Sequence, residues 1–242
     1  MAISTIMKKL SMATAGAAFV ALGAAGSAQA TTLWYNGDFD GVSGRANEIN
    51  TLVSNAYYIY DDFTVGEGKV WNIDTIWSNN LMDFTGVTQS TWSIGTGVFQ
   101  GNGGTVVASG TSAATQTATG RSGYGFNEYN IQVSGLNINL GAGNYWLSVT
   151  PIGFGSGRSF NSTTSGLNAV GTPAGNNDNS FWNSSYFGTN FQAQNTDYSM
   201  GIAGIVKPVP EPASTLGLLA LGAMGAGSML KRKQQQKATV KA

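Results

Sequence analysis

Residues 56–65, Ala-Tyr-Tyr-Ile-Tyr-Asp-Asp-Phe-Thr-Val, and residues 70–77, Val-Trp-Asn-Ile-Asp-Thr-Ile-Trp, decide the fold class of this chain. Both runs are rich in aromatic and β-branched residues, which favour strands over helices. Gly66-Glu67-Gly68 lies between them and predicts a turn. The second run alternates with a period of two, which predicts one face made of Trp71, Ile73, Thr75 and Trp77 and an opposite face that carries Asn72 and Asp74.

Shorter runs of the same kind continue along the chain. Strands are predicted at residues 91–94, 104–109, 128–133, 136–140, 144–150 and 198–206, the last with Tyr198, Met200, Ile202 and Val206 on one face. Residues 111–119 are small and rich in threonine, and they fit either an edge strand or a flexible loop. Residues 154–197 alternate little and are predicted to form an irregular insertion, which at this length is unusual unless it is functional.

The pattern as a whole indicates an all-β fold. No stretch between residues 31 and 206 keeps the 3.6-residue apolar period of a helix, and turns rich in glycine and asparagine separate the short strands. We therefore predict an antiparallel β-sandwich, jelly-roll-like, over residues 31–206. We expect it to be flanked by an N-terminal signal peptide and a C-terminal transmembrane helix.

Composition excludes several kinds of chemistry. The chain has no cysteine and no histidine, so disulfides, Ser-His-Asp and Cys-His catalysis, and the usual zinc and copper sites are all excluded. Residues 31–206 carry four basic and eleven acidic residues, a net charge of about −7. An acidic domain lacks the basic footprint that nucleic-acid binding needs, so no nucleic-acid partner is expected.

The N-terminus has the three parts of a secretory signal peptide. Lys8 and Lys9 provide the charged region, residues 10–25 are apolar, and Ala28-Gln29-Ala30 is a small-x-small cleavage box. Cleavage after Ala30 makes residues 1–30 the signal peptide and Thr31 the first mature residue. The alternative is an uncleaved membrane helix.

The C-terminus also has three parts in a fixed order. Val209-Pro210-Glu211-Pro212 is expected to be stiff and extended, because proline lacks a backbone donor and constrains the residue before it. Residues 213–230 are uncharged and as a helix would extend roughly 27 Å. That length nearly matches a membrane core of about 30 Å. Lys231-Arg232-Lys233 opens the basic tail (231–242), and it predicts a stop-transfer signal on the cytoplasmic side.

This order resembles the PEP-CTERM sorting signal of exosortase substrates, over residues 207–242. The resemblance implies an exosortase-type partner and recognition through Pro210, Glu211 and Pro212. It also implies passage through the inner membrane of a Gram-negative-type bacterium, followed by delivery to the cell surface or extracellular matrix. The alternative is a permanent single-pass anchor. The preceding domain is also similar to one that recurs in this family, as at Tyr60-Asp61-Asp62-Phe63 and Phe181-Trp182-Asn183-Ser184, but that similarity implies no reaction.

Two loops are candidate calcium sites. Asp38 and Asp40 alternate with Phe39 between glycines, and Asp178 lies within Asn176-Asn177-Asp178-Asn179. Carboxylate and amide oxygens are the ligands that calcium prefers. The alternative for both loops is a solvated turn, so no cofactor is predicted unless calcium binds there.

A second set of residues suggests contact with glycans. Phe181, Trp182, Asn183 and Tyr186 lie in the irregular 154–197 segment, where rings can stack on sugars while amides bind hydroxyls. The alternative is that these rings pack beneath the loop. No catalytic residues are predicted, because Asp61 and Asp62 are adjacent and face opposite sides of a strand.

Together these features predict an exported, exosortase-sorted protein, not an enzyme, with a structural or adhesive role in biofilm or exopolysaccharide. The first alternative is a calcium-dependent carbohydrate-binding module. The second is a secreted glycoside hydrolase that assembles its carboxylates from distant parts of the chain.

Overall fold

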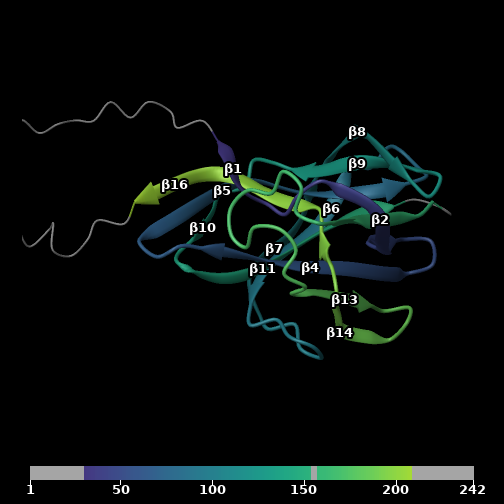
Figure 1. The fold of residues 1–242 in the computed structure, drawn as a ribbon. Helices are drawn as coiled ribbons and strands as arrows, with labels where there is room; N and C mark the ends of the chain where they lie inside the picture. The colour runs from purple at the N-terminus through teal and green to yellow at the C-terminus, as the bar shows by residue number, and fades with distance from the viewer. Residues whose placement is uncertain (1–29, 154–156, 209–242) are drawn as a thin grey trace, which may run out of the picture.

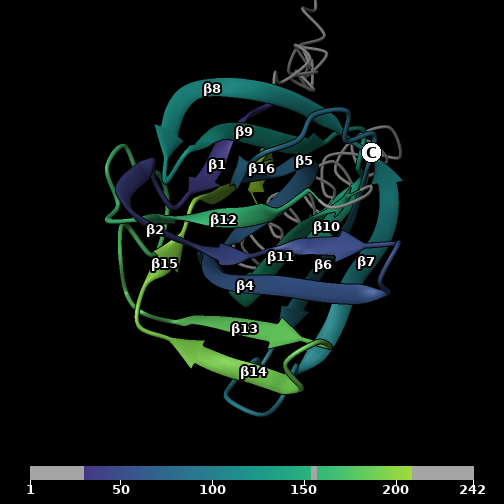
Figure 2. The ribbon, with the colours of Figure 1, turned by 90° about the vertical axis from the view of Figure 1, so that its right-hand side faces the viewer.

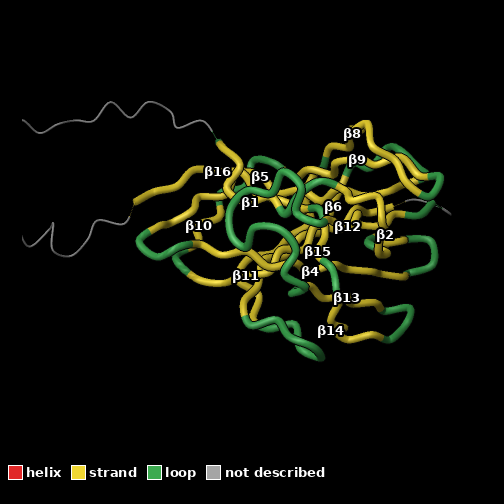
Figure 3. Tube along the Cα trace, viewed as in Figure 1, coloured by secondary structure: helices red, strands yellow, loops and turns green. Residues whose placement is uncertain are grey.

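The computed structural model of the chain describes residues 30–153 and 157–208, which form sixteen strands and no helix (Figures 1 and 3). Within these residues no helix is long and apolar enough to cross a membrane. The predicted signal peptide with Ala28, the transmembrane helix at 213–230, the sorting motif 209–212 and the basic tail lie outside the described residues. The strands make two sheets that face each other.

The first sheet has nine strands and is built around the long strand β5 (Lys69–Met82). β5 pairs with β16, β9, β10 and β12, all antiparallel. The other members of this sheet are β1 (Thr31–Tyr35), β2 (Phe39–Ala46), β8 (Thr115–Gly123), β9 (Phe126–Val133), β10 (Ile138–Leu140), β12 (Ser159–Thr164), β15 (Asp197–Tyr198) and β16 (Met200–Pro208).

The second sheet has seven strands in the order β14-β13-β4-β3-β11-β6-β7. Its strands are β3 (Glu48–Asn50), β4 (Asn55–Val65), β6 (Gln89–Thr96), β7 (Thr105–Ala113), β11 (Gly143–Gly153), β13 (Ser180–Ser184) and β14 (Thr189–Gln194). One pairing is parallel, a short one between β3 and β11. Figure 2 shows β13 and β14 side by side next to β4, at one edge of this sheet.

The core lies between the two sheets. Phe63 of β4 stacks on Trp71 of β5, with 5.8 Å between ring centroids, and also contacts Trp34 and Tyr145. All four rings are buried, together with aliphatic residues of β5, β6, β11 and β16. The predicted all-β, antiparallel, sandwich-like fold is therefore confirmed.

A β-bulge explains where the simple alternation fails. Between β5 and β16 the register shifts at Ala203 and Gly204, which leaves Asp74 as the extra residue on β5. A bulge reverses which face the following side chains occupy. Trp71, Ile73 and Thr75 are buried as predicted, but Ile76 then takes the buried position and Trp77 packs against Tyr35 instead. On β16 the alternation continues: Val206 pairs with the buried Trp71 and so lies on the face of Met200 and Ile202, as predicted, but near the end of the strand it is 46% exposed.

The prediction of an irregular 154–197 segment was also wrong. This region contains β12, β13 and β14, and β15 begins at its end. β12 and β13 contain Ser, Asn and Thr side chains that are mostly buried against other strands instead of alternating with apolar ones. Residues 31–55, where no strand was predicted, hold three further strands, and residues 111–119 belong mostly to two strands, β7 and β8, in different sheets.

Buried polar side chains connect the two sheets. Asn47 donates hydrogen bonds to the Asn80 side chain and to the Val149 carbonyl, both at 3.0 Å, and its own side-chain oxygen accepts from Thr150 at 2.8 Å. Asn80 is on β5 of the first sheet, and Val149 and Thr150 are on β11 of the second. Each unpaired buried group would cost about 1–3 kcal/mol, so these bonds fix how the sheets lie on each other.

A second connection is centred on Asp61 of β4, which is fully buried. Its carboxylate accepts hydrogen bonds from the Asn36 side chain at 3.0 Å, the Tyr198 backbone N–H at 2.6 Å and the Asp62 N–H at 2.9 Å. Burial, and then the nearby Asp197 carboxylate, raise the pKa of Asp61 well above its ordinary range. The N–H donors oppose that rise.

Asp62 and Asp197 hold the segment that leads into β13. The Asn177 backbone N–H donates to Asp197 at 2.7 Å, and its side chain donates to Asp62 at 3.0 Å. Burial raises the pKa of both carboxyls, that of Asp197 to about 6, with further repulsion from Asp62. The second side-chain oxygen of Asp197 is buried without a partner. Asp61 and Asp62, which are adjacent on β4, thus hold different segments: Asp61 binds residues 36 and 198, and Asp62 binds residue 177.

Substituting Asp197→Asn should change how stability depends on pH. The folded pKa of about 6 lies above the ordinary 3.8, so Asp197 contributes stability below pH 4 that is lost as the pH rises through about 6. The variant mimics the protonated acid. We expect its unfolding temperature to equal that of the wild type near pH 4 and to be higher at pH 7. The difference in unfolding free energy at pH 7 should be on the order of 2 kcal/mol.

Thermal unfolding of both proteins from pH 4 to pH 8 measures this difference, with the exposed Glu67→Gln as the charge-matched control. If Asp197→Asn loses stability in parallel with the wild type over this range, Asp197 does not carry a raised pKa.

Substituting Gly201→Ala should destabilise the sandwich. A methyl group at Gly201 would overlap the Trp77 indole, which lies directly against this glycine. Overpacking of this kind costs about 1–3 kcal/mol. Melting curves should therefore show a midpoint several degrees lower, whereas Gly141→Ala, where a methyl group would meet no atom within 4 Å, should leave the midpoint unchanged. Equal midpoints for both variants would contradict the packing described for Trp77.

Candidate functional site

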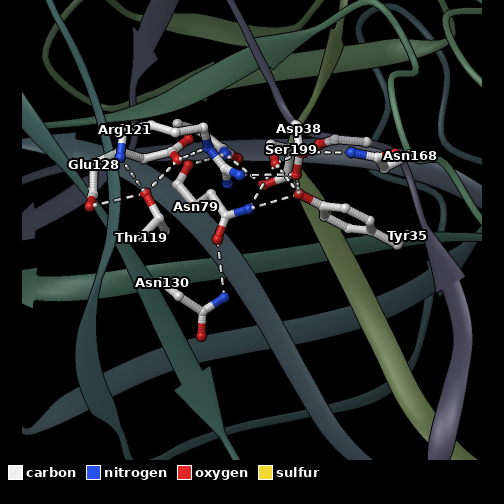
Figure 4. Close-up of polar contacts among 11 residues, drawn as sticks. Tyr35, Asp38, Asn79, Thr119, Arg121, Glu128, Asn130, Asn168 and Ser199 are labelled. Atoms are coloured by element: carbon white, nitrogen blue, oxygen red, sulfur yellow. Dashed lines mark hydrogen bonds and ion pairs between the residues drawn. The ribbon is translucent and has the colours of Figure 1, made fainter.

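One polar network joins β1, β8, β9 and Asp38 in the connection from β1 to β2, and Figure 4 shows it around Arg121. Arg121 forms ion pairs with Asp38 at 2.9 Å and with Glu128 at 2.5 Å, and Thr119 donates to the same Glu128 oxygen at 2.7 Å. Asp38 also accepts from Tyr35 at 2.7 Å. Arg121 therefore neutralises the two carboxylates that meet here.

The ionised state of Asp38 is favoured by this arrangement. Burial opposes ionisation, but hydrogen bonds from Tyr35 and Asn168 and the charge of Arg121 outweigh it and hold the pKa of Asp38 below its ordinary value. The neighbouring Tyr35 hydroxyl has its pKa raised to about 12, chiefly by burial. At neutral pH Asp38 is therefore ionised and Tyr35 is neutral, and their contacts with Arg121 and with each other stabilise the fold.

The three candidate calcium ligands do not form one cluster. Asp40 accepts from the Thr163 hydroxyl at 2.7 Å and the Val42 N–H at 2.8 Å, whereas Asp38 is paired with Arg121. Asp178 is exposed on the segment before β13. Among residues 30–153 and 157–208, no group of three or more carboxylates is arranged to hold a metal ion. Calcium binding by these residues stays a prediction.

The most exposed aromatic rings of the second sheet lie in the turn between β13 and β14. We call residues 185–188 the aromatic turn. Tyr186 and Phe187 are 61% and 62% exposed and contact each other edge to face at 4.8 Å. The turn is fixed on β4, because the Ser185 N–H donates to the Ala56 carbonyl at 3.0 Å and the Ser185 hydroxyl accepts from the Ala56 N–H at 2.9 Å. The rings are therefore held out at a defined place.

Buried rings support the aromatic turn from below. Trp182 of β13 stacks on Tyr57 of β4 at 6.3 Å and contacts Phe187 at 5.5 Å. Its indole N–H donates to the Ala46 carbonyl at 2.9 Å, across to the first sheet. The guanidinium of Arg45 lies 3.8 Å from the centre of the same indole. Trp182 thus links the two sheets beneath the exposed rings.

Two depressions flank Phe187. The first, which we call the arginine pocket, has a volume of about 510 Å³, and the second, the tyrosine pocket, about 410 Å³. They share Arg158 and Phe187, and both sizes fall in the range of ligand sites. The arginine pocket is lined by Arg45, Arg158, Phe160, Trp182, Phe187 and Gln192. The tyrosine pocket is lined by Glu48, Asn55, Tyr57, Arg158, Tyr186 and Phe187.

Charge differs between the two pockets. Glu48 contributes the carboxylate of the tyrosine pocket; burial raises its pKa, while the Ser159 N–H at 3.0 Å and the charge of Arg158 oppose the rise. Arg158 lies 3.8 Å from Glu48, beyond hydrogen-bonding distance, and its side chain is 53% exposed. The described lining of the arginine pocket contains two guanidinium groups and no carboxylate.

The structure divides the four predicted glycan-contact residues. Tyr186 is exposed, and Trp182 is buried as a wall of the arginine pocket. Phe181 points to the other side of β13, where it packs against Trp146, and Asn183 is half-buried. Sequence reasoning missed Tyr57, Arg45 and Arg158, because they come from β4, from β2 and from the residue just before β12. The one available signal was that this acidic domain has only three arginines.

Comparison with known proteins gives one match. The family model described as the PEP-CTERM protein-sorting motif matches residues 208–233, in agreement with the resemblance seen at the C-terminus. No curated protein and no solved structure matches the chain. The chain thus carries a PEP-CTERM protein-sorting motif, which implies processing by an exosortase-type enzyme and export through a membrane-anchored intermediate to the cell surface.

Proposed function

We propose that this chain is a non-enzymatic protein of the extracellular matrix of a Gram-negative-type bacterium. In this role the sorting signal delivers the β-sandwich outside the cell, and the sandwich then binds exopolysaccharide and contributes to the structure or adhesion of a biofilm. Two features support the proposal: the matched sorting motif at 208–233, and the aromatic turn with its two flanking pockets.

The observation that carries the binding role is the exposure of Tyr186 and Phe187 beside concave surfaces. Large rings are normally buried, since exposing them to water is unfavourable, so an ordered, exposed pair is expected to meet a ligand. Sugar rings present C–H faces that stack on aromatic rings. Asn55 and Gln192 in the adjacent pockets supply amides for sugar hydroxyls.

A binding role is favoured over hydrolysis by the distribution of carboxylates. Glycoside hydrolases generally use two carboxylates that flank one bond. Of the described residues that line the two pockets, only Glu48 is a carboxylate. The Asp61, Asp62 and Asp197 carboxylates are buried and accept hydrogen bonds from N–H groups. A lone carboxylate in a pocket offers no acid–base pair.

The sorting step is tested by changing Pro210, Glu211 and Pro212 together to alanine. We expect fractionated native cells to retain this variant in the inner membrane, because the processing enzyme no longer recognises the segment, whereas the wild type reaches the cell surface. The control is Lys237→Ala, a change in the basic tail outside the matched motif. Equal distribution of all three proteins would show that the motif does not direct sorting.

The binding step is tested with a Tyr186→Ala, Phe187→Ala double variant. Affinity electrophoresis through gels that contain exopolysaccharide from the native biofilm should show retardation of the full-length wild type. The variant should bind at least about tenfold more weakly, which corresponds to about 1.4 kcal/mol. Phe99→Ala removes a ring that is 57% exposed outside both pockets and should bind as the wild type does. Equal retardation of all three would rule out the aromatic turn as the contact.

A further inference from the structure

We propose that the arginine pocket binds a carboxylate-bearing sugar ring, so that the ligand is an acidic, uronate-containing polysaccharide. This inference rests on the proposed glycan binding and adds the charge of the ligand.

Cationic side chains are scarce here, so their placement carries information. Within 31–206 the basic residues are Arg45, Lys69, Arg121 and Arg158, against eleven acidic ones. Arg121 forms ion pairs with Asp38 and Glu128, so its charge is already neutralised. The other two arginines both line the arginine pocket. Two like charges at one concave surface repel each other, and a bound anion would relieve that repulsion.

Neither arginine of the pocket is neutralised by a close contact. No carboxylate of the described residues forms an ion pair with Arg45, and its Nε is buried without a hydrogen-bond partner. Arg158 meets Glu48 only at 3.8 Å and stays half exposed. Guanidinium groups match carboxylates with two parallel N–H···O bonds. The arginine pocket thus holds donors that an acidic ligand would satisfy.

The walls of the arginine pocket favour a sugar over a small inorganic anion. Phe160, Trp182 and Phe187 supply ring surfaces, and Gln192 supplies an amide. The Arg45 guanidinium is placed over Trp182 and the Arg158 guanidinium lies 5.0 Å from the Phe160 ring, so each cation adjoins an apolar wall. A pyranose that bears a carboxylate offers an apolar face, hydroxyls and a negative charge in one unit. Its chemistry therefore fits all three parts of the pocket.

The test compares two probes of equal length by calorimetric titration of the full-length chain in detergent: a hexamer of galacturonate and a neutral cellohexaose. Both are measured in EDTA and again with calcium. The variants are Arg45→Gln and Arg158→Gln, and Lys69→Gln removes an exposed positive charge outside the pocket. Melting temperatures confirm that each variant is folded. If Arg45→Gln fails to fold because Trp182 loses its contact, the exposed Arg158→Gln carries the test alone.

We expect the wild type and Lys69→Gln to bind the uronate at least about tenfold more tightly than the neutral hexamer in EDTA, with this preference lost in Arg158→Gln. Equal affinity for both probes, unchanged by the arginine substitutions, would overturn the acidic-ligand inference and leave glycan binding intact. Uronate binding that requires calcium and ignores both arginines would also overturn it. Failure of both probes to bind, together with no retardation by native exopolysaccharide, would overturn both proposals.

Discussion

The fold depends on a carboxylate that is buried between two sheets. Asp61 is fully buried on β4, and an ionised or neutral acid in that place needs hydrogen-bond partners. Its partners come from both ends of the domain: Asn36, which follows β1, and the Tyr198 backbone in β15. Both donors reach the same oxygen of Asp61, so losing either would weaken the hydrogen bonding of a buried carboxylate, at a cost of about 1–3 kcal/mol. This requirement fixes the chain ends against the centre of the second sheet.

The candidate binding surface follows from the same arrangement. Asp62 and Asp197 hold Asn177, and the Asn179 carbonyl accepts a hydrogen bond from the Trp146 indole at 3.1 Å. That segment leads directly into β13, whose pairing with β4 places Trp182 under the aromatic turn. The exposed rings therefore stand on strands that are anchored by buried polar groups. A rigid support of this kind lowers the entropic cost of ligand binding, because the rings are already ordered.

The sequence predicted the all-β class well, since the runs at 56–65 and 70–77 bury their apolar faces as β4 and β5. The strand predictions failed where polar residues occupy buried positions. In β12, Asn161 and Ser162 are fully buried, so a rule based on apolar alternation predicts a loop there. The bulge at Asp74 was invisible because it depends on pairing with β16. Of the candidate site, Trp182 and Tyr186 were found because ring type is local information. Arg45 and Arg158 were missed because only the pairing of β12 with β2 brings them to one pocket.

The sorting motif matched at 208–233 implies that this domain is exported to the cell surface. The most direct test is the intact mass of the protein recovered from the extracellular matrix of native cells. Exosortase processing predicts a mature chain that begins at Thr31 and ends near Pro212, without the apolar and basic segments that follow. A mass that includes every residue through Ala242, found only in the membrane fraction, would contradict exosortase processing. The domain would then be a permanently anchored protein, and the proposed role in the matrix would lose its main support.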